Sequence, residues 1–222
     1  MGKLEHIPVE LDPLEIKEKL RLDRSENMET LIKTAQPLIK ARALYKVSYV
    51  DDRLEDALQL DGVRFRSRVL RTNLGKAERV FPYVATIGQE LEDRAASCKD
   101  LLEQYYLDTI GNVAITAARK FLENHLRDVF QAGKMSRMNP GSLSDWPIQE
   151  QKTLFSILGD VDAAIGVRLT ESYLMIPRKS VSGIYFPTEI SFLSCEICPR
   201  KECPSRQAAY DRTLAMKYRV AE

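Results

Sequence analysis

The residues best suited to chemistry in this sequence are three cysteines that lie close together. The run SCEICPRKECPSR, residues 194–206, contains Cys195, Cys198 and Cys203, whereas the whole chain of 222 residues has 4 cysteines. Two thiolates at the spacing C-x2-C can face one metal from a tight turn, and a Cys-Pro pair ends many iron–sulfur ligand runs. The run is therefore typical of a metal or iron–sulfur site, of a disulfide, or of reactive thiols.

The number of ligands separates these interpretations only in part. Three thiols are one short of the four that zinc and iron–sulfur sites usually have. Cys98 is expected to be the fourth ligand if the fold brings it near, and an external thiol, a water or a substrate would fill the position otherwise. Zinc sites more often show two knuckles or a mixed Cys/His set, and a C-x2-C pair can also be a redox dithiol. An iron–sulfur cluster is favoured, with zinc, redox thiols and no role left open.

Other catalytic signatures are missing from the sequence. It has 2 histidines, His6 and His125, and neither belongs to a zinc pattern or an HExxH helix. It contains no GxGxxG, no Walker loop and no GxSxG elbow. No pair of carboxylates stands out by its spacing, so the sequence gives little support to a hydrolase.

Two short runs are rich in residues that let a backbone approach a ligand. RMNPGS, residues 137–142, places Arg137 beside a turn at Asn139, Pro140 and Gly141, followed by Ser142. Proline fixes φ, glycine can take φ > 0 and expose backbone amides, and an adjacent arginine can hold a carboxylate through two hydrogen bonds.

The second run is SVSG, residues 180–183, in which Ser180, Ser182 and Gly183 are small enough for close approach of a ligand. Taken alone, each run is more typical of an ordinary turn.

Composition excludes several classes of partner. The net charge is +1, with 33 basic and 32 acidic side chains, so no strong field favours nucleic acid or anionic lipid. No stretch of about 18 apolar residues occurs, which argues against a membrane span. The start MGKLEHIPVELD lacks an apolar signal region, so we expect a cytoplasmic protein with no nucleic-acid or membrane partner. In a reducing compartment, clustered cysteines are more often metal ligands or redox groups than disulfides.

The order of the predicted elements indicates an α+β fold in which helices pack around an antiparallel sheet. We expect an N-terminal helical segment over residues 1–42, a core over 43–190 and a Cys-rich, helical C-terminal tail over 191–222. Helices are predicted from Pro13 to Leu22 and over 25–42, 89–100, 101–130, 150–158 and 204–220. Strands are predicted over 43–50, 62–70, 79–88, 169–177 and 182–187, the last two joined by a turn at 178–182, and a polar turn region over 131–147. Gly111 and three nearby alanines predict close packing of the long helix against a neighbour.

The two glycine-containing runs, taken together and in order, resemble the activation domain of cobalamin-dependent methionine synthase. That family has R-x-x-P-G-Y, then H-T-E-K, then I-G-x-x-L-T-E-S-x-x-M-x-P-x-x-S-V-S-G-x-Y-F. The matching residues are Arg137, Pro140, Gly141, Ile165, Gly166, Leu169, Thr170, Glu171, Ser172, Met175, Pro177, Ser180, Val181, Ser182, Gly183, Tyr185 and Phe186. The resemblance extends over roughly residues 110–187. Upstream, FPYVATIGQELE, residues 81–92, looks like stand-alone members of the family.

The resemblance implies a C-shaped α+β fold around a twisted antiparallel sheet. It implies a protein that binds S-adenosylmethionine and docks on the corrinoid-binding domain of a methyltransferase, most directly methionine synthase. When the cobalamin there is oxidised to cob(II)alamin, one electron from a donor and the methyl group of S-adenosylmethionine restore methylcobalamin. The protein would then be an accessory subunit whose task is positioning rather than acid–base chemistry.

Only part of the family's ligand-binding site has matching residues in this sequence. Arg137 would hold the ligand's carboxylate, and the backbone at Asn139–Gly141 would line its pocket. The family's tyrosine after the glycine is Ser142 here, and its acidic ligand-binding residue falls at Thr116. The family's later H-P-x-x-x-Y-Y is replaced by PTEISFLSCEIC.

These departures leave three hypotheses. The first is a stand-alone activator that binds S-adenosylmethionine, with a cluster at the cysteines that delivers the electron. The second is a non-enzymatic corrinoid-protein interaction module or iron–sulfur redox relay that has lost the ligand. The third is a scaffold whose cysteines hold a structural zinc.

Overall fold

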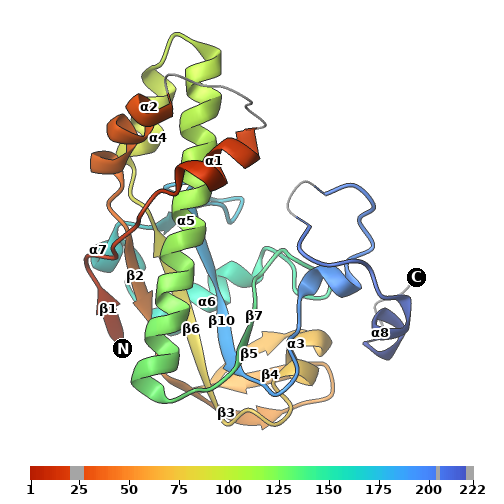
Figure 1. Ribbon diagram of the computed structural model, residues 1–222. Helices are drawn as coiled ribbons and strands as arrows, with labels where there is room; N and C mark the ends of the chain where they lie inside the picture. The colour runs from red at the N-terminus through yellow and green to blue at the C-terminus, as the bar shows by residue number, and fades with distance from the viewer. Residues whose placement is uncertain (21–27, 204–205, 219–222) are drawn as a thin grey trace.

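A twisted antiparallel sheet with one long helix along one face organises the protein (Figure 1). In this computed structural model the described residues are 1–20, 28–203 and 206–218. The fold confirms the predicted α+β class with an antiparallel sheet and surrounding helices. Within the described residues, no helix is long and apolar enough to cross a membrane.

The main sheet has eight strands, and β6 (Arg79–Thr86) is its centre. One series runs β1 (Gly2–Leu4), β2 (Arg42–Tyr45), β6, β3 (Ser48–Arg53), β4 (Ala57–Leu60) and β5 (Val63–Arg66). β10 (Ser180–Pro187) also pairs with β6, and β7 (Met135–Met138) pairs with β10. β8 (Arg168–Leu169) and β9 (Met175–Ile176) form a separate small hairpin.

The helices cover both faces of this sheet. They are α1 (Pro13–Leu20), α2 (Met28–Ala35), α3 (Arg68–Asn73), α4 (Glu90–Ser97), α5 (Leu101–Phe130), α6 (Glu150–Leu158), α7 (Val161–Ile165) and α8 (Arg212–Lys217), with 3-10 turns η1 (Gln36–Leu38) and η2 (Ser194–Ile197). Figure 1 shows α1, α2 and α4 gathered around the N-terminal part of α5, which extends beyond the sheet.

Burial of β6 on both faces divides the apolar interior in two. Phe81, Tyr83 and Ala85 belong to a cluster with α1, α2 and α5, on what we call the α5 face. Val80 and Val84 belong to a second cluster with α3, α6 and α7, on the α6 face. Because side chains alternate along a strand, one strand supplies both clusters. The predicted buried strand over 79–88 is observed as β6, which ends two residues earlier, at Thr86.

The long helix α5 has the predicted bounds, 101–130. The Asp100 side chain caps it by accepting a hydrogen bond from the Leu102 backbone N–H at 2.9 Å. Gly111 lies where the aliphatic chain of Lys179 crosses the helix, and a Cβ there would be 3.1 Å from Lys179 Cε. The prediction of close packing at this glycine is confirmed.

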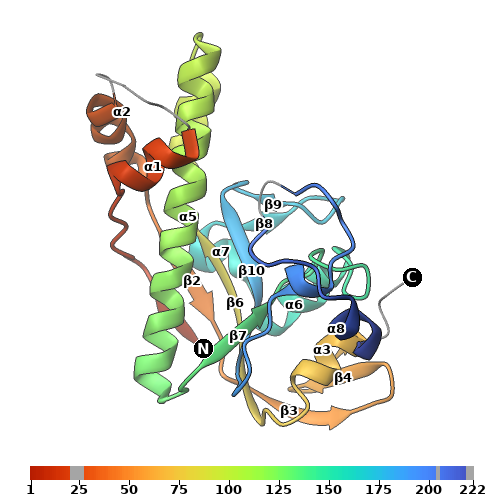
Figure 2. The same cartoon turned by 45° about the vertical axis from the view of Figure 1, so that its right-hand side comes forward.

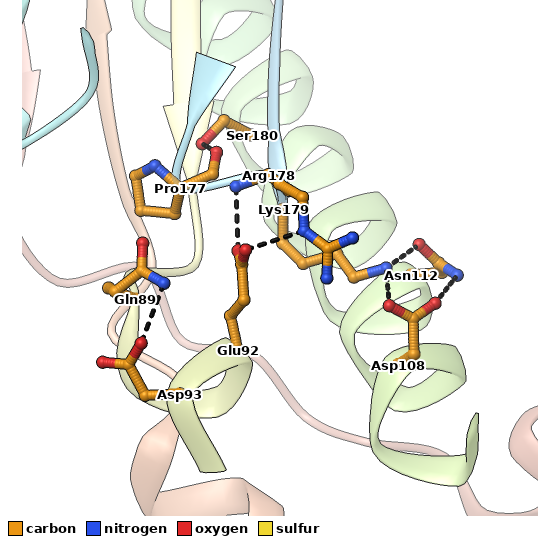
Figure 3. Close-up of polar contacts among 9 residues, drawn as sticks. All are labelled: Gln89, Glu92, Asp93, Asp108, Asn112, Pro177, Arg178, Lys179 and Ser180. Carbon is orange, nitrogen blue, oxygen red and sulfur yellow. Dashed lines mark hydrogen bonds and ion pairs between the residues drawn. The ribbon is translucent and has the colours of Figure 1, made fainter. Parts of the chain in front are cut away.

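A polar network ties α4 and α5 to the segment that precedes β10 (Figure 3). The Glu92 carboxylate accepts hydrogen bonds from the Arg178 backbone N–H at 2.9 Å and from its Nε at 2.7 Å. Lys179 Nζ contacts Asp108 at 2.8 Å and donates to Asn112 Oδ1 at 2.8 Å. The network fixes where β10 begins relative to both helices.

Several predicted boundaries were wrong in the first half of the chain. The strand expected over 43–50 is two strands, β2 and β3. The strand expected over 62–70 ends at Arg66, because the Ser67 side chain accepts from Leu70 N–H at 2.9 Å and starts α3. The helix expected over 25–42 is α2 followed by η1, which contains Pro37 and ends at Leu38. Its residues 25–27, and residues 21–22 of the helix expected from Pro13 to Leu22, lie outside the described residues. β4 and β7 were not predicted.

The segment before β10 was also misread. The stretch 169–177 is not a strand beside 182–187 but most of the β8–β9 hairpin, and β10 starts at Ser180 rather than after a turn. The reason is pairing, since Ser180, Val181 and Ser182 are already hydrogen-bonded partners of Thr86, Ala85 and Val84 in β6.

The tail contains far less helix than predicted. Of the expected helix over 204–220, the described part has only α8, whose N-cap Asp211 accepts from Leu214 N–H at 2.9 Å. Residues 204–205 and 219–222 lie outside the described residues. The Tyr218 hydroxyl donates to Asn73 Oδ1 at 2.6 Å, so the end of the tail lies against α3 (Figure 2).

We expect Glu92→Ala to lower the free energy of unfolding by about 1 kcal/mol, because the Arg178 backbone N–H loses its acceptor while the exposed ion pair adds little. Asp93→Ala on the same helix is the control, since Asp93 accepts only from the exposed Gln89 side chain at 3.0 Å. Urea denaturation measures both. Equal stability of the two variants would contradict this account.

Candidate functional site

A cavity of about 550 Å³ lies between the turn that follows β7 and the C-terminal tail. We call it the Arg137 pocket. Predicted site residues line it from both sides: Arg137, Asn139, Gly141 and Ser142 from the turn, and Cys195, Cys198 and Cys203 from the tail. The arginine turn and the cysteine run, singled out for different reasons, thus face one space.

Backbone hydrogen bonds within the loop at residues 139–146 hold the turn in shape. Gly141 has φ +83°, which favours glycine, and a Cβ there would be 3.0 Å from Ile148 Cδ1. Its N–H donates to the Trp146 carbonyl at 2.7 Å, and the Ser142 N–H donates to the Asn139 carbonyl at 3.2 Å. These two amides are therefore occupied, and the turn offers a ligand its shape rather than the free N–H groups that the sequence suggested.

Asp145 anchors the same loop to α3. Its carboxylate accepts from Ser67 Oγ at 2.5 Å and from Val69 N–H at 2.9 Å, both at the start of that helix. The next residue, Trp146, is fully buried on the α6 face. A capped helix and a buried indole together fix the wall of the pocket.

Asn139 joins the two predicted turn motifs. Its side-chain amide donates to the Ser182 carbonyl and, at 3.2 Å, to the Tyr83 hydroxyl. Gly183 makes this approach possible, since a Cβ at that position would clash with the Met138 carbonyl and lie 2.7 Å from Asn139 Nδ2. Gly183 is a packing requirement inside β10, where the sequence suggested a ligand contact.

The two serines of the second motif point elsewhere. Ser182 Oγ donates to Gln151 Oε1 of α6 at 2.5 Å, and Ser180 Oγ donates to the Pro177 carbonyl at 2.7 Å. Both serines line a neighbouring hollow of about 370 Å³, together with Asn139 and Pro140. The predicted binding residues therefore divide between two hollows that share Asn139.

Arg137 stands beside buried aromatic side chains. Its cross-strand partner in β10 is Tyr185, which stacks on Tyr83 at 4.5 Å between ring centroids. Burial raises the pKa of both hydroxyl groups, and that of Tyr185 lies well above its ordinary value. Both tyrosines stay neutral at physiological pH, and they lie buried behind Arg137 rather than in the lining of the pocket.

Two further polar residues complete the surroundings of Arg137. Arg119 of α5 donates to the Tyr185 hydroxyl at 3.3 Å, with Glu123 at 3.5 Å from its guanidinium. Arg137 Nη2 donates to the side-chain oxygen of Gln207 in the tail at 3.3 Å. Among the described residues, the Arg137 guanidinium therefore donates to one acceptor, the neutral side-chain amide of Gln207.

The four cysteines do not form one group. All four are free and partly buried. Cys98 ends α4 and packs on the α5 face, whereas Cys198 packs on the α6 face. The structure does not bring Cys98 to the tail, because Cys98 and Cys198 pack against different apolar clusters. Among the described residues, no three His, Cys, Asp or Glu side chains are grouped to hold a metal ion.

Some residues of the site could not have been found from the sequence. Asp145, Gln151 and Gln207 act through partners at least 31 residues away, which no local pattern announces. Thr116, which the resemblance was expected to align with an acidic residue of the family, donates to the Asn112 carbonyl of its own helix at 2.8 Å and is exposed. It does not line the Arg137 pocket.

Residues 132–193 match the family model described as "Vitamin B12 dependent methionine synthase, activation domain". Among solved structures, the chain is similar to the crystal structure of the MetH reactivation domain bound to AdoHcy, with a TM-score of 0.55 and 16% sequence identity. That similarity covers 89% of this chain and 82% of the other. A search of curated proteins found no match.

This chain resembles the activation domain of vitamin B12-dependent methionine synthase. The segment matched to that activation domain contains the whole arginine turn and both motif serines. It ends at residue 193, so the three tail cysteines lie beyond it. The activation-domain segment supplies one wall of the Arg137 pocket, and the tail supplies the other.

We expect Gly183→Ala to lower the free energy of unfolding by about 1–3 kcal/mol, the usual range for overpacking a core. The added methyl group would push Asn139 away from β10. Gly111→Ala is the comparison variant and should cost less, because its Cβ would meet side-chain carbons of Lys179, with Cε at 3.1 Å, rather than backbone, and alanine favours a helix over glycine by up to about 1 kcal/mol. Thermal or urea unfolding measures the stability of both variants. An unchanged free energy of unfolding for Gly183→Ala would contradict the close approach of Asn139 to β10.

Proposed function

We propose that this protein binds S-adenosylmethionine in the Arg137 pocket and uses its methyl group to restore oxidised cobalamin on a partner protein. The observation that carries this proposal is the position of Arg137 and its turn at a cavity of about 550 Å³, within the segment that matches the activation-domain model. The similar solved structure was obtained with AdoHcy bound, the product that S-adenosylmethionine leaves after methyl transfer. The partner would be a corrinoid-binding domain of a methyltransferase.

Arg137 would bind the carboxylate of the ligand. Its guanidinium now donates to the neutral amide of Gln207 at 3.3 Å. A carboxylate is a stronger acceptor and can take two parallel hydrogen bonds from an arginine. Exchange of Gln207 for a ligand carboxylate is therefore favourable, and the buried tyrosine pair behind Arg137 limits where the guanidinium can move.

The reaction requires positioning rather than proton transfer. One electron reduces cob(II)alamin to cob(I)alamin, whose cobalt displaces the methyl group from the sulfonium and leaves AdoHcy. No proton moves, which suits a pocket lined by two arginines, two side-chain amides, small and aliphatic residues and thiols. The protein's contribution is to hold the methyl group in line with the cobalt of its partner.

A second candidate function is a corrinoid-protein interaction module that has lost the ligand. It is favoured by Thr116, which bonds to its own helix, and by Ser142, which stands where the family has a tyrosine. Direct binding of S-adenosylmethionine separates the two functions.

We expect Arg137→Ala to weaken S-adenosylmethionine binding about tenfold to a hundredfold, because a hydrogen bond to a charged group contributes about 1.5–3 kcal/mol. Arg168→Ala, an exposed arginine in β8 outside the pocket, should bind as the wild type does. Isothermal titration calorimetry with S-adenosylmethionine and with AdoHcy measures both, and circular dichroism checks folding. Wild-type binding that is absent, or equal in Arg137→Ala, would contradict the proposal.

A further inference from the structure

We propose that the Arg137 pocket binds AdoHcy, whose sulfur is neutral, more tightly than S-adenosylmethionine, whose sulfur is a cation, and that Arg200 is the residue that sets this preference. The inference deepens the proposed function and rests on it. Its basis is the charge of the cavity, which is lined by arginines and by no carboxylate in the described part of the chain. The site would then be restrained by its own product.

The two walls of the cavity each contribute one positive charge. Arg137 lies on the turn wall and Arg200 on the tail wall. Among the described residues, neither guanidinium belongs to an ion pair. Arg137 donates to the side-chain amide of Gln207 at 3.3 Å, which is a neutral acceptor. The charges of both arginines therefore act on whatever occupies the cavity.

A third arginine lies behind the tail wall. Arg206 donates to the Cys195 carbonyl at 3.0 Å and to the Ala208 carbonyl at 3.2 Å. Both acceptors are neutral, so they satisfy its hydrogen bonds without cancelling its charge. Arg206 also donates to the Arg200 carbonyl, which ties the backbone that carries Arg200 to the rest of the cysteine run.

The acidic residues of the same segment do not compensate these charges inside the cavity. Glu196 Oε2 accepts from the Leu193 backbone N–H at 2.9 Å at the start of η2, and Glu196 does not line the cavity. Glu202 is exposed and does not line it either. The tail wall therefore presents positive charge to a ligand.

The two ligands differ in charge at the sulfur atom. S-adenosylmethionine has a carboxylate, an ammonium group and a sulfonium, so it carries one net positive charge. AdoHcy has the same carboxylate and ammonium group but a neutral thioether, so it carries none. Arg137 would bind the carboxylate of either ligand, and Arg200 then has no anionic group left to bind. The sulfonium is the part of the ligand that the wall repels and that the product lacks.

The size of the cavity makes this repulsion large enough to measure. A volume of about 550 Å³ corresponds to a width on the order of 10 Å, which is no greater than the Debye length at 0.1 M salt. At that separation, one pair of like unit charges changes an affinity about twofold to tenfold for effective dielectric constants of about 80 to 25. The expected contribution of Arg200 lies in this range.

The preference has a consequence for turnover. The methyl group leaves as the sulfonium becomes a neutral sulfide, so the repulsion from Arg200 is relieved when the product forms. The product then occupies the site more tightly than the next substrate molecule does. The fraction of sites ready for methyl transfer therefore depends on the ratio of S-adenosylmethionine to AdoHcy.

The first experiment compares three ligands on the full chain by isothermal titration calorimetry. They are S-adenosylmethionine, AdoHcy and sinefungin, in which a carbon that bears an ammonium group replaces the methylated sulfur and keeps the positive charge. AdoHcy should bind at least about twofold more tightly than both cationic ligands. Raising the salt concentration should narrow the difference, because the Debye length shortens. Equal affinities, tighter binding of the cationic ligands, or a difference that salt leaves unchanged would overturn the inference.

The second experiment assigns the preference to Arg200. Arg200→Gln should tighten binding of S-adenosylmethionine and sinefungin by about twofold to tenfold and change AdoHcy binding much less. Lys201→Gln is the matched control, since it removes the same charge from the next residue, which is exposed and does not line the cavity. An unchanged ligand preference in Arg200→Gln, or an equal change in Lys201→Gln, would overturn the role of Arg200.

The same titrations distinguish this inference from the proposed function. Binding of S-adenosylmethionine and AdoHcy with equal affinity overturns the charge preference and leaves the proposed function standing. Absence of binding for all three ligands contradicts the proposed function, and the inference falls with it.

Discussion

The contact between Asn139 and β10 is the constraint on which the rest of the site depends. It joins two segments 43 residues apart by a hydrogen bond from a side-chain amide to the Ser182 carbonyl. The approach is so close that only a residue without a Cβ can occupy position 183. Because Asn139 is fixed, the turn at Pro140 and Gly141 and the outward course of β7 are fixed with it, and Arg137 is presented at the edge of the sheet.

The two walls of the Arg137 pocket are held by different forces. The turn wall rests on the core through buried Trp146 and through Asp145, whose carboxylate accepts from the Val69 N–H in the first turn of α3. The tail wall rests on one turn anchored by Ile197 and on the hydrogen bonds of Arg206. Arg137 and Gln207 connect the walls by one neutral hydrogen bond. A ligand that displaces Gln207 therefore acts on the segment next to the cysteine loop, which couples the two halves of the site physically.

The chemistry that the site supports is one of placement. Its buried tyrosines are held neutral because burial raises the pKa of each, and its cations are arginines, whose guanidinium groups donate hydrogen bonds and accept none. Neither group can act as a base, whereas the two arginines that line the pocket, Arg137 and Arg200, can orient a charged ligand. The thiols are the residues of the pocket with redox chemistry available, and they come from the tail, beyond residue 193, where the match to the activation domain ends.

The sequence by itself determined the α+β class, the long helix over 101–130, a buried strand beginning at residue 79 and the two glycine motifs, because each is a local pattern of periodicity, capping or spacing. Local patterns also led to the wrong strand at 62–70, where a serine cap starts α3, and to the wrong helix in the tail. Only the tertiary structure decided that Arg137 shares a cavity with three cysteines and that Cys98 packs on the α5 face. It also decided that Gly183, which has no Cβ, leaves room for the Asn139 side chain. Those facts depend on β10 lying between β6 and β7, a pairing of residues far apart in the chain that no local pattern encodes.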